Sequence, residues 1–188
     1  NDLRYTLLSD GSSDRGLLPI LTWLVRNHLP DRTVQAQWAD LRCLPRPPQS
    51  LADRISIAID LNPCDLLFVH RDAERQSYEE RKAEIEQAAG GGVPCVCVIP
   101  VRMTEAWLMF NETAIRRASG NPNGTVALDI PPLIGVEKLS DPKSRLHGIL
   151  RDASELRRRR LKKLRPESAA CRITEYIQDF SPLRRLCA

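Results

Sequence analysis

Two kinds of segment alternate along the chain, short apolar runs and longer stretches in which apolar residues recur at helical spacing. Four short runs have the length and composition of β-strands: 3–9, 33–41, 65–70 and 93–101. Three stretches between them have the periodicity of amphipathic helices: 17–25, 51–61 and 78–89. Strands that alternate with helices predict an α/β fold with a mainly parallel central sheet and helices on both of its faces.

Polar residues and glycines mark the ends of the predicted helices. Asp14 and Ser50 each stand before a helix, where a side-chain oxygen can accept hydrogen bonds from the first free backbone N–H groups. Gly90-Gly91-Gly92 ends the third helix, because glycine adopts the left-handed conformation common at helix ends. We therefore expect Asp14 and Ser50 to be helix N-caps.

The chain beyond residue 103 has a mostly helical pattern. We expect a helix over 104–119, a loop rich in Asn, Pro and Gly over 121–132, and helical structure over 144–179 with a break at Pro166. The sequence thus predicts two parts. An α/β core occupies residues 1–119, and a loop and basic C-terminal helical extension, residues 120–188, packs on that core.

Acidic residues follow three of the predicted strands. Asp10 comes after the first strand, Asp72 and Glu74 after the third, and Glu105 after the fourth. The carboxyl ends of parallel strands share one edge of a sheet, and ligands bind there. Carboxylates gathered at one place repel each other unless a cation offsets their charge, and oxygen ligands favour Mg²⁺ or Mn²⁺. We predict such a metal, held by Asp10, Asp72, Glu74 and Glu105, with Asp14 in support.

Four motifs, taken in order, carry a resemblance to a known family. Leu8–Asp14 is similar to an acidic-Gly-x-Thr-acidic motif, and Phe68–Glu74 to an Asp-x-Asp motif. Pro100–Leu108 is similar to the signature Pro-x-x-x-x-Glu-x-Trp-Leu, and 141–143 to Asn/Asp-Pro-Lys. The chain therefore resembles the Toprim domains, in particular the DUF4276-like and OLD-nuclease-like group, over about the first 145 residues.

This resemblance implies a function. Proteins of the group are divalent-metal-dependent nucleases that hydrolyse phosphodiesters of DNA or RNA, often beside an ATPase partner in phage-defence systems. The resemblance places catalytic roles on Asp10, Asp14, Asp72 and Glu74. The family usually has Glu at the first of these positions, and Asp10 is one methylene shorter.

Positive charge is concentrated near the C-terminal end of the sequence. The formal net charge is only +4, yet Arg157, Arg158, Arg159 and Arg160 are consecutive. We predict that these arginines and Lys143 bind phosphate groups. Aromatic residues make up only 5% of the chain, so contact with the nucleic-acid backbone is favoured over base stacking. A solvated helix face and an acidic protein partner are the alternatives for the arginine run.

The acidic residues also have structural interpretations. Asp14 can be a helix cap alone, and Asp72 and Glu74 can be the acids that favour a helix N-terminus. Arg71 can neutralise the acids, and His70 can be a packed histidine. Arg71 beside the acids, and Asp10 where the family usually has Glu, favour a catalytically silent interaction module in a defence or repair assembly. A receiver-like phosphoacceptor domain fits less well, because its acid pair should directly follow the first strand.

The cysteines and histidines argue against a zinc site. The six cysteines form no Cys-x-x-Cys pair, and the three histidines are scattered. Cys95 and Cys97, two apart on a predicted strand, point to one face and behave as small core residues. We expect reduced thiols and a cytoplasmic protein. No apolar stretch is long enough to span a membrane, so no membrane partner is expected; assembly into a homo-oligomer stays open.

Overall fold

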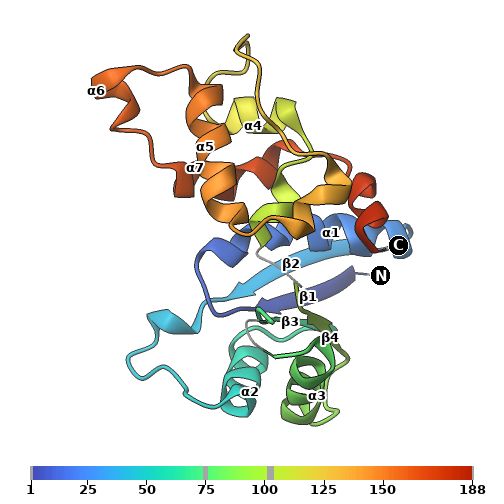
Figure 1. The fold of residues 1–188 in the computed structure, drawn as a ribbon. Coiled ribbons are helices and arrows are strands. Elements are labelled where there is room, and N and C mark those ends of the chain that lie inside the picture. Colours follow the sequence, from blue (N-terminus) through green and yellow to red (C-terminus); the bar gives the residue numbers. More distant parts are fainter. Residues whose placement is uncertain (1, 74–75, 101–103, 188) are drawn as a thin grey trace. The chain divides into compact units, whose positions relative to one another are not determined.

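The computed structural model describes residues 2–73, 76–100 and 104–187 (Figure 1). It confirms an α/β fold with a parallel sheet and a C-terminal helical region. The chain divides into two compact units, Asn1–Val101 and Arg102–Ala188. The sequence placed the boundary after residue 119, so Glu105, expected in the α/β core, belongs to the second unit instead.

The first unit is built on a four-stranded, all-parallel sheet. Its strand order is β2-β1-β3-β4, with these bounds: β1 (Asp2–Leu8), β2 (Thr33–Ala39), β3 (Leu66–His70) and β4 (Cys95–Val98). Each strand lies within or close to a predicted apolar run. Leu8 near the end of β1 is level with Ala39 of β2 and Val69 of β3, so the carboxyl ends of these strands lie at one edge.

Helices cover both faces of this sheet, as the sequence predicted. α1 (Leu17–His28) lies on one face, and α2 (Leu51–Leu61) and α3 (Tyr78–Ala89) lie on the other (Figure 1). The buried Tyr5 hydroxyl of β1 donates a hydrogen bond of 2.9 Å to the backbone oxygen of Leu18 in α1. This bond satisfies the polar end of an otherwise apolar side chain between the sheet and α1.

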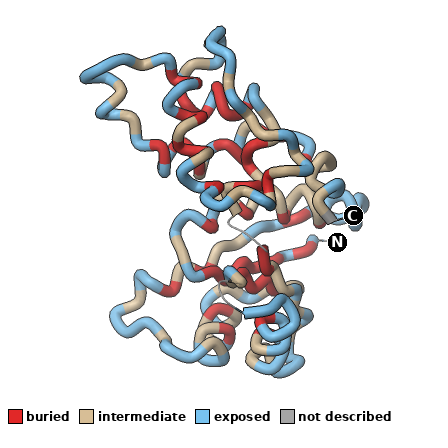
Figure 2. The backbone as a smooth tube through the Cα atoms, in the orientation of Figure 1, coloured by how far each residue is buried: buried red, intermediate tan, exposed pale blue. Residues whose placement is uncertain are grey.

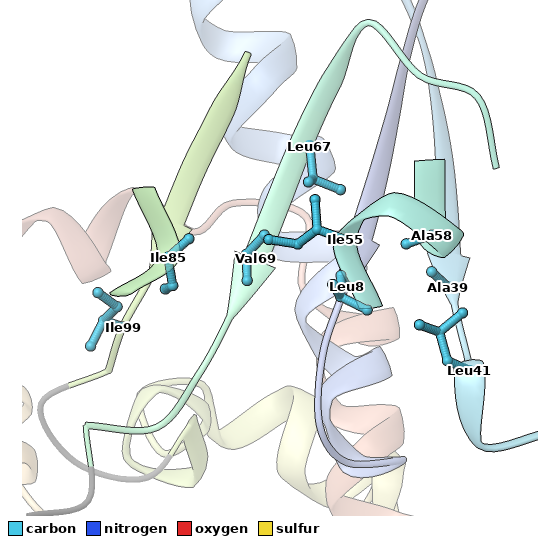
Figure 3. Packing of buried hydrophobic residues seen from close by; sticks show 9 residues of the cluster. All are labelled: Leu8, Ala39, Leu41, Ile55, Ala58, Leu67, Val69, Ile85 and Ile99. Atoms are coloured by element: carbon cyan, nitrogen blue, oxygen red, sulfur yellow. The ribbon is translucent and has the colours of Figure 1, made fainter. Parts of the chain in front are cut away.

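The core between the sheet and α2 and α3 consists of aliphatic side chains (Figure 3). Ile55 of α2 and Ile85 of α3 are almost completely buried against the strands, and each such side chain contributes about 1.5–3 kcal/mol. In Figure 2 the buried residues of this unit are concentrated along β1 and β3, and the exposed ones lie on the outer sides of α2 and α3 and in the connecting segments. Cys95 and Cys97 pack against this core as expected. Cys43, Cys64, Cys95 and Cys97 are free thiols.

The ends of α2 and α3 follow from local side-chain chemistry. The Ser50 side chain accepts a 3.0 Å hydrogen bond from the Asp53 N–H, which confirms the predicted cap. Ser77 and Glu80 form a reciprocal capping box at the start of α3. Gly90, with φ of 61°, ends α3 in the left-handed region. Both helices have the bounds that the sequence predicted.

The prediction that Asp14 caps α1 is wrong. A short 3-10 helix, η1 (Ser13–Gly16), precedes α1, and Gly16 is the N-cap residue of α1. The Asp14 carboxylate is turned back along the chain, where its Oδ2 accepts a 2.8 Å hydrogen bond from the Gly11 N–H. A side chain that binds an upstream N–H group is not free to cap the helix that follows.

The second unit is helical in its described part. The apolar faces of its three longest α-helices pack against one another around buried residues such as Ile115, Leu146, Leu150 and Ile173. The elements are η3 (Thr104–Leu108), α4 (Glu112–Ala118), η4 (Leu133–Lys138), α5 (Pro142–Ser154), α6 (Arg158–Leu161), α7 (Pro166–Ile173), η5 (Thr174–Tyr176) and η6 (Ser181–Cys187). None of the described helices is both long and apolar enough to cross a membrane.

Two predicted helices are divided in the structure. The expected helix over 104–119 is interrupted, because the Asn111 side chain accepts a 2.9 Å hydrogen bond from the Ala114 N–H and starts α4 anew. The helical region after residue 144 also breaks at Glu155, whose φ is 53°. The predicted break at Pro166 is present, as the start of α7. The arginine run therefore lies in and beside the single turn of α6, and not on a long helix.

Candidate active site at the carboxyl edge of the sheet

The order of the strands creates a switch point between β1 and β3. From β1 the chain passes over one face through α1 to β2, and from β2 it returns over the other face through α2 to β3. In open parallel sheets, ligands bind beyond the carboxyl ends of the strands where the order reverses in this way. The segments at this point are 9–14 after β1 and 71–72 after β3.

Asp10 lies between two arginine side chains at this edge. Arg54, in the first turn of α2, contacts Asp10 Oδ1 through Nη1 and donates from Nη2 to the Ser9 backbone oxygen at 3.0 Å. Arg71 Nε lies 3.4 Å from Asp10 Oδ2, so Arg71 is placed to neutralise the acid as one sequence interpretation expected. Trp38 Nε1 at the end of β2 donates to Ser9 Oγ at 3.1 Å and steadies this loop.

Arg71 is also held from a second side. Its Nη1 lies 2.6 Å from Glu84 Oε1 on α3, and the other carboxylate oxygen of Glu84 accepts from Arg81 at 2.7 Å. Arg81 is buried, with 5% of its surface exposed. Contacts from α2 and α3 thus fix the guanidinium groups on both sides of Asp10.

Asp14 is the buried acid of the site. Its carboxylate accepts from the Gly11 N–H at 2.8 Å and from the Ser13 hydroxyl at 3.3 Å, and its Oδ2 lies 3.3 Å from His70 Nδ1. Burial alone would raise the pKa of Asp14, but the contact with His70 and the two donors outweigh it and lower the pKa below its ordinary value. Asp14 therefore stays ionised and ties the loop after β1 to the end of β3.

His70 lies between two acidic residues. It is 2% exposed, and its Nε2 lies 3.8 Å from Asp72 Oδ1 on the side opposite Asp14. Neither ring nitrogen has an acceptor in hydrogen-bond geometry among the described residues, so these are ion-pair distances without aligned hydrogen bonds. The burial agrees with the interpretation of His70 as a packed histidine. The Asp72 side chain is more than half exposed.

The remaining predicted site residues are either outside the described residues or in the second unit. Glu74 is outside the described residues, and Glu105 is in η3 of the second unit. Lys143 is exposed in the first turn of α5, where Asp141 accepts a 2.9 Å hydrogen bond from the Ser144 N–H. The arginines 157–160 are all exposed. Of the predicted site residues, Asp10, Asp14 and Asp72 lie on the segments that follow β1 and β3 at the switch point.

The donor atoms at this edge suit a hard divalent cation. Asp10 and Asp72 supply carboxylate oxygens, which Mg²⁺ prefers, and Mg²⁺ keeps several waters, so two or three carboxylates suffice. Within residues 2–73, 76–100 and 104–187, no three His, Cys, Asp or Glu side chains lie close enough to hold a metal ion. A complete ligand set would thus need Glu74 or another group in addition to Asp10 and Asp72.

Sequence reasoning missed Arg54. A helix that returns from a parallel strand begins beside the carboxyl ends of the strands, so its first turn reaches the same edge as the acids. The fourth position of such a helix, where Arg54 stands, could have indicated a basic residue at the site. To use this indication one must know that α2 covers β1.

Comparison of the chain with protein-family models, with curated proteins and with solved structures found no match. The function is therefore argued from the geometry of the site and from the motifs in the sequence.

Proposed function

We propose that this chain is a Toprim-like, divalent-metal-dependent nuclease, or the nuclease-type subunit of an assembly, which hydrolyses nucleic-acid phosphodiesters. The observation that carries the proposal is the placement of Asp10 and Asp72 after the adjacent parallel strands β1 and β3, at the switch point of the sheet. The resemblance of the sequence motifs to the Toprim pattern supports the same function and adds an ATPase partner and a phage-defence context to the proposal.

The residues divide into ligands and supports. Asp10 and Asp72, with Glu74, would hold Mg²⁺ or Mn²⁺, which supplies charge stabilisation for the phosphate and lowers the pKa of water when bound. Glu105 belongs to the second unit, so its role as a ligand stays a prediction from the sequence. Asp14 is already engaged by Gly11 and His70, so it acts by positioning the loop that carries Asp10. This role replaces the direct catalytic role that the sequence suggested for Asp14.

Nucleic acid is the proposed substrate because of the exposed basic segment 157–165. It holds seven Arg or Lys residues among nine, and each of these seven is exposed. Together with Lys143 it supplies the cations that bind a phosphate backbone without regard to sequence. Such a surface does not distinguish DNA from RNA.

A titration of Mn²⁺ into the wild type, Asp72→Ala and Asp60→Ala tests the proposal. Asp60 is an exposed acid at the far end of α2, so its loss matches the charge change without touching the site. We expect the wild type and Asp60→Ala to bind Mn²⁺ and cleave a mixed DNA and RNA substrate set, and Asp72→Ala to lose both properties while keeping its melting temperature. Normal cleavage by Asp72→Ala would refute the mechanism.

One observation favours a second candidate, a catalytically silent interaction module. Arg54 and Arg71 already compensate the charge of Asp10, so a cation is not needed for that purpose. On this view the wild type binds no Mn²⁺, alone or with an oligonucleotide, and its melting temperature does not change with Mg²⁺ or Mn²⁺. The same titration thus separates the two candidates.

A further inference from the structure

The contacts around Asp10 are asymmetric. The side chains of Arg54 and Arg71 are 18% and 23% exposed, whereas that of Asp10 is 46% exposed. Each arginine has a second anchor that does not depend on Asp10, the Ser9 backbone oxygen for Arg54 and Glu84 for Arg71. The two guanidinium groups are therefore fixed in place, and Asp10 is their exposed, replaceable partner.

The arginine donors are also incompletely used. Arg71 Nε is buried and lies 3.4 Å from Asp10 Oδ2, but it has no acceptor in hydrogen-bond geometry among the described residues. A planar carboxylate offers two oxygens, whereas a phosphate group offers three or four in a tetrahedral arrangement. Guanidinium groups recognise such oxyanions through paired N–H donors. The pair of arginines thus suits a phosphate better than the carboxylate that it holds.

We propose that Arg54 and Arg71 form an oxyanion site for a phosphate group of the substrate, and that the Asp10 carboxylate occupies this site until a phosphate displaces it. The identity of that phosphate as part of a nucleic acid rests on the proposed function. Displacement is easy because ion pairs with a solvent-exposed partner are weak. Once displaced, Asp10 is free to turn to a cation, so the arrival of substrate tightens the binding of the metal.

This exchange makes Asp10 a competitor of the phosphate in the absence of metal. Asp10→Asn removes the competing charge and keeps both arginines, so it should tighten phosphate binding, by about tenfold. Arg54→Gln or Arg71→Gln removes one arm of the site and should abolish the binding. Substitution of the acidic residue and substitution of its basic partners should thus change the phosphate affinity in opposite directions. In a purely structural ion-pair network, both kinds of substitution would act in the same direction.

The experiment is a calorimetric titration of inorganic phosphate at low salt in the presence of EDTA. Asp129→Asn and Arg145→Gln serve as controls, because these two residues form an ion pair in the second unit and their changes match the charges removed. We expect both controls to bind phosphate like the wild type. Equal phosphate affinity in Asp10→Asn and the wild type, or an equal gain in Asp129→Asn, would overturn the proposal.

Two further measurements distinguish an effect on phosphate binding from an effect on folding or on metal binding. Circular dichroism and melting temperature report whether each variant folds; if the arginine variants do not, Asp10→Asn alone decides, since it keeps Arg54 and Arg71. EDTA makes the phosphate titration independent of metal. If the wild type binds Mn²⁺ but Asp10→Asn binds phosphate no more tightly than the wild type, the oxyanion site is rejected and the proposed nuclease function stands. If Asp10→Asn binds phosphate more tightly but the wild type binds no Mn²⁺, the oxyanion site stands and the proposed nuclease function is rejected.

Discussion

Replacement of Asp14 by alanine should destabilise the first unit, because one buried carboxylate joins the loop after β1 to the end of β3. The change removes the acceptor of the Gly11 N–H at 2.8 Å and the charged neighbour of His70 at 3.3 Å. A hydrogen bond to a charged group contributes about 1.5–3 kcal/mol, and a buried polar group left without a partner adds to the loss. With the Asp14 side chain only 12% exposed, we expect the free energy of unfolding to fall by about 2–4 kcal/mol at pH 7.

The effect should depend on pH in a definite direction. The pKa of Asp14 is lower in the folded protein than its ordinary value of 3.8, which is the value expected in the unfolded chain. A lowered pKa means that the stabilisation is fully present above 3.8 and is lost as the pH falls through the folded value. The stabilisation by the Asp14 carboxylate should therefore be present above about pH 5 and should shrink below pH 4.

Urea denaturation followed by circular dichroism measures both quantities. Asp60→Ala is the control, since Asp60 is exposed and its loss should change the stability by less than about 0.5 kcal/mol. A change below that size in Asp14→Ala at pH 7 would refute the structural role. A difference that is as large at pH 3 as at pH 7 would refute the electrostatic part of the reasoning.

Three further expectations concern other parts of the chain. Replacing all four arginines 157–160 by glutamine should reduce the slope of log affinity against log salt for duplex DNA by up to about 4, as a filter-binding series would measure. Gly124→Ala should lower the free energy of unfolding, measured by urea denaturation, by about 1 kcal/mol, because a Cβ there would lie 2.7 Å from Glu155 Oε1 and would displace a carboxylate that binds the N–H groups of the same loop. Iodoacetamide at pH 7.5 should label the exposed Cys43 well before Cys95, whose pKa burial raises to about 11; equal labelling by peptide mass spectrometry would contradict this.

The sequence predicted the elements whose determinants are local. The strands are short apolar runs, and α2 and α3 begin at serine caps, so their bounds could be found without tertiary information. The failures arose where a polar side chain bound a partner that the pattern does not reveal. Asn111 starts a new helix inside an apparently continuous one, and Glu155 ends α5 while its carboxylate accepts from the distant Thr125 and Val126 N–H groups.

The candidate site was predictable in its position but not in its contacts. That Asp10 and Asp72 follow adjacent strands at one edge of the sheet is expected from parallel strands alone. That Arg54 holds Asp10 across 44 residues depends on which face α2 covers and on how its first turn meets β1. The charge balance of a site is decided by such long-range pairs, and the spacing of acids along the sequence contains no information about them.

The position of β1 in the sheet has a consequence for how the chain folds. β1 precedes its neighbours in the sequence, yet it is an inner strand that pairs with β2 on one side and β3 on the other. Its second partner begins only at Leu66, so a ribosome must synthesise the segment as far as His70 before both edges of β1 can be covered. Contacts this distant in sequence slow folding, and the apolar β1 stays available for wrong pairing in the meantime. Until β3 pairs with β1, a nascent chain of this protein is therefore exposed to aggregation and to chaperone binding.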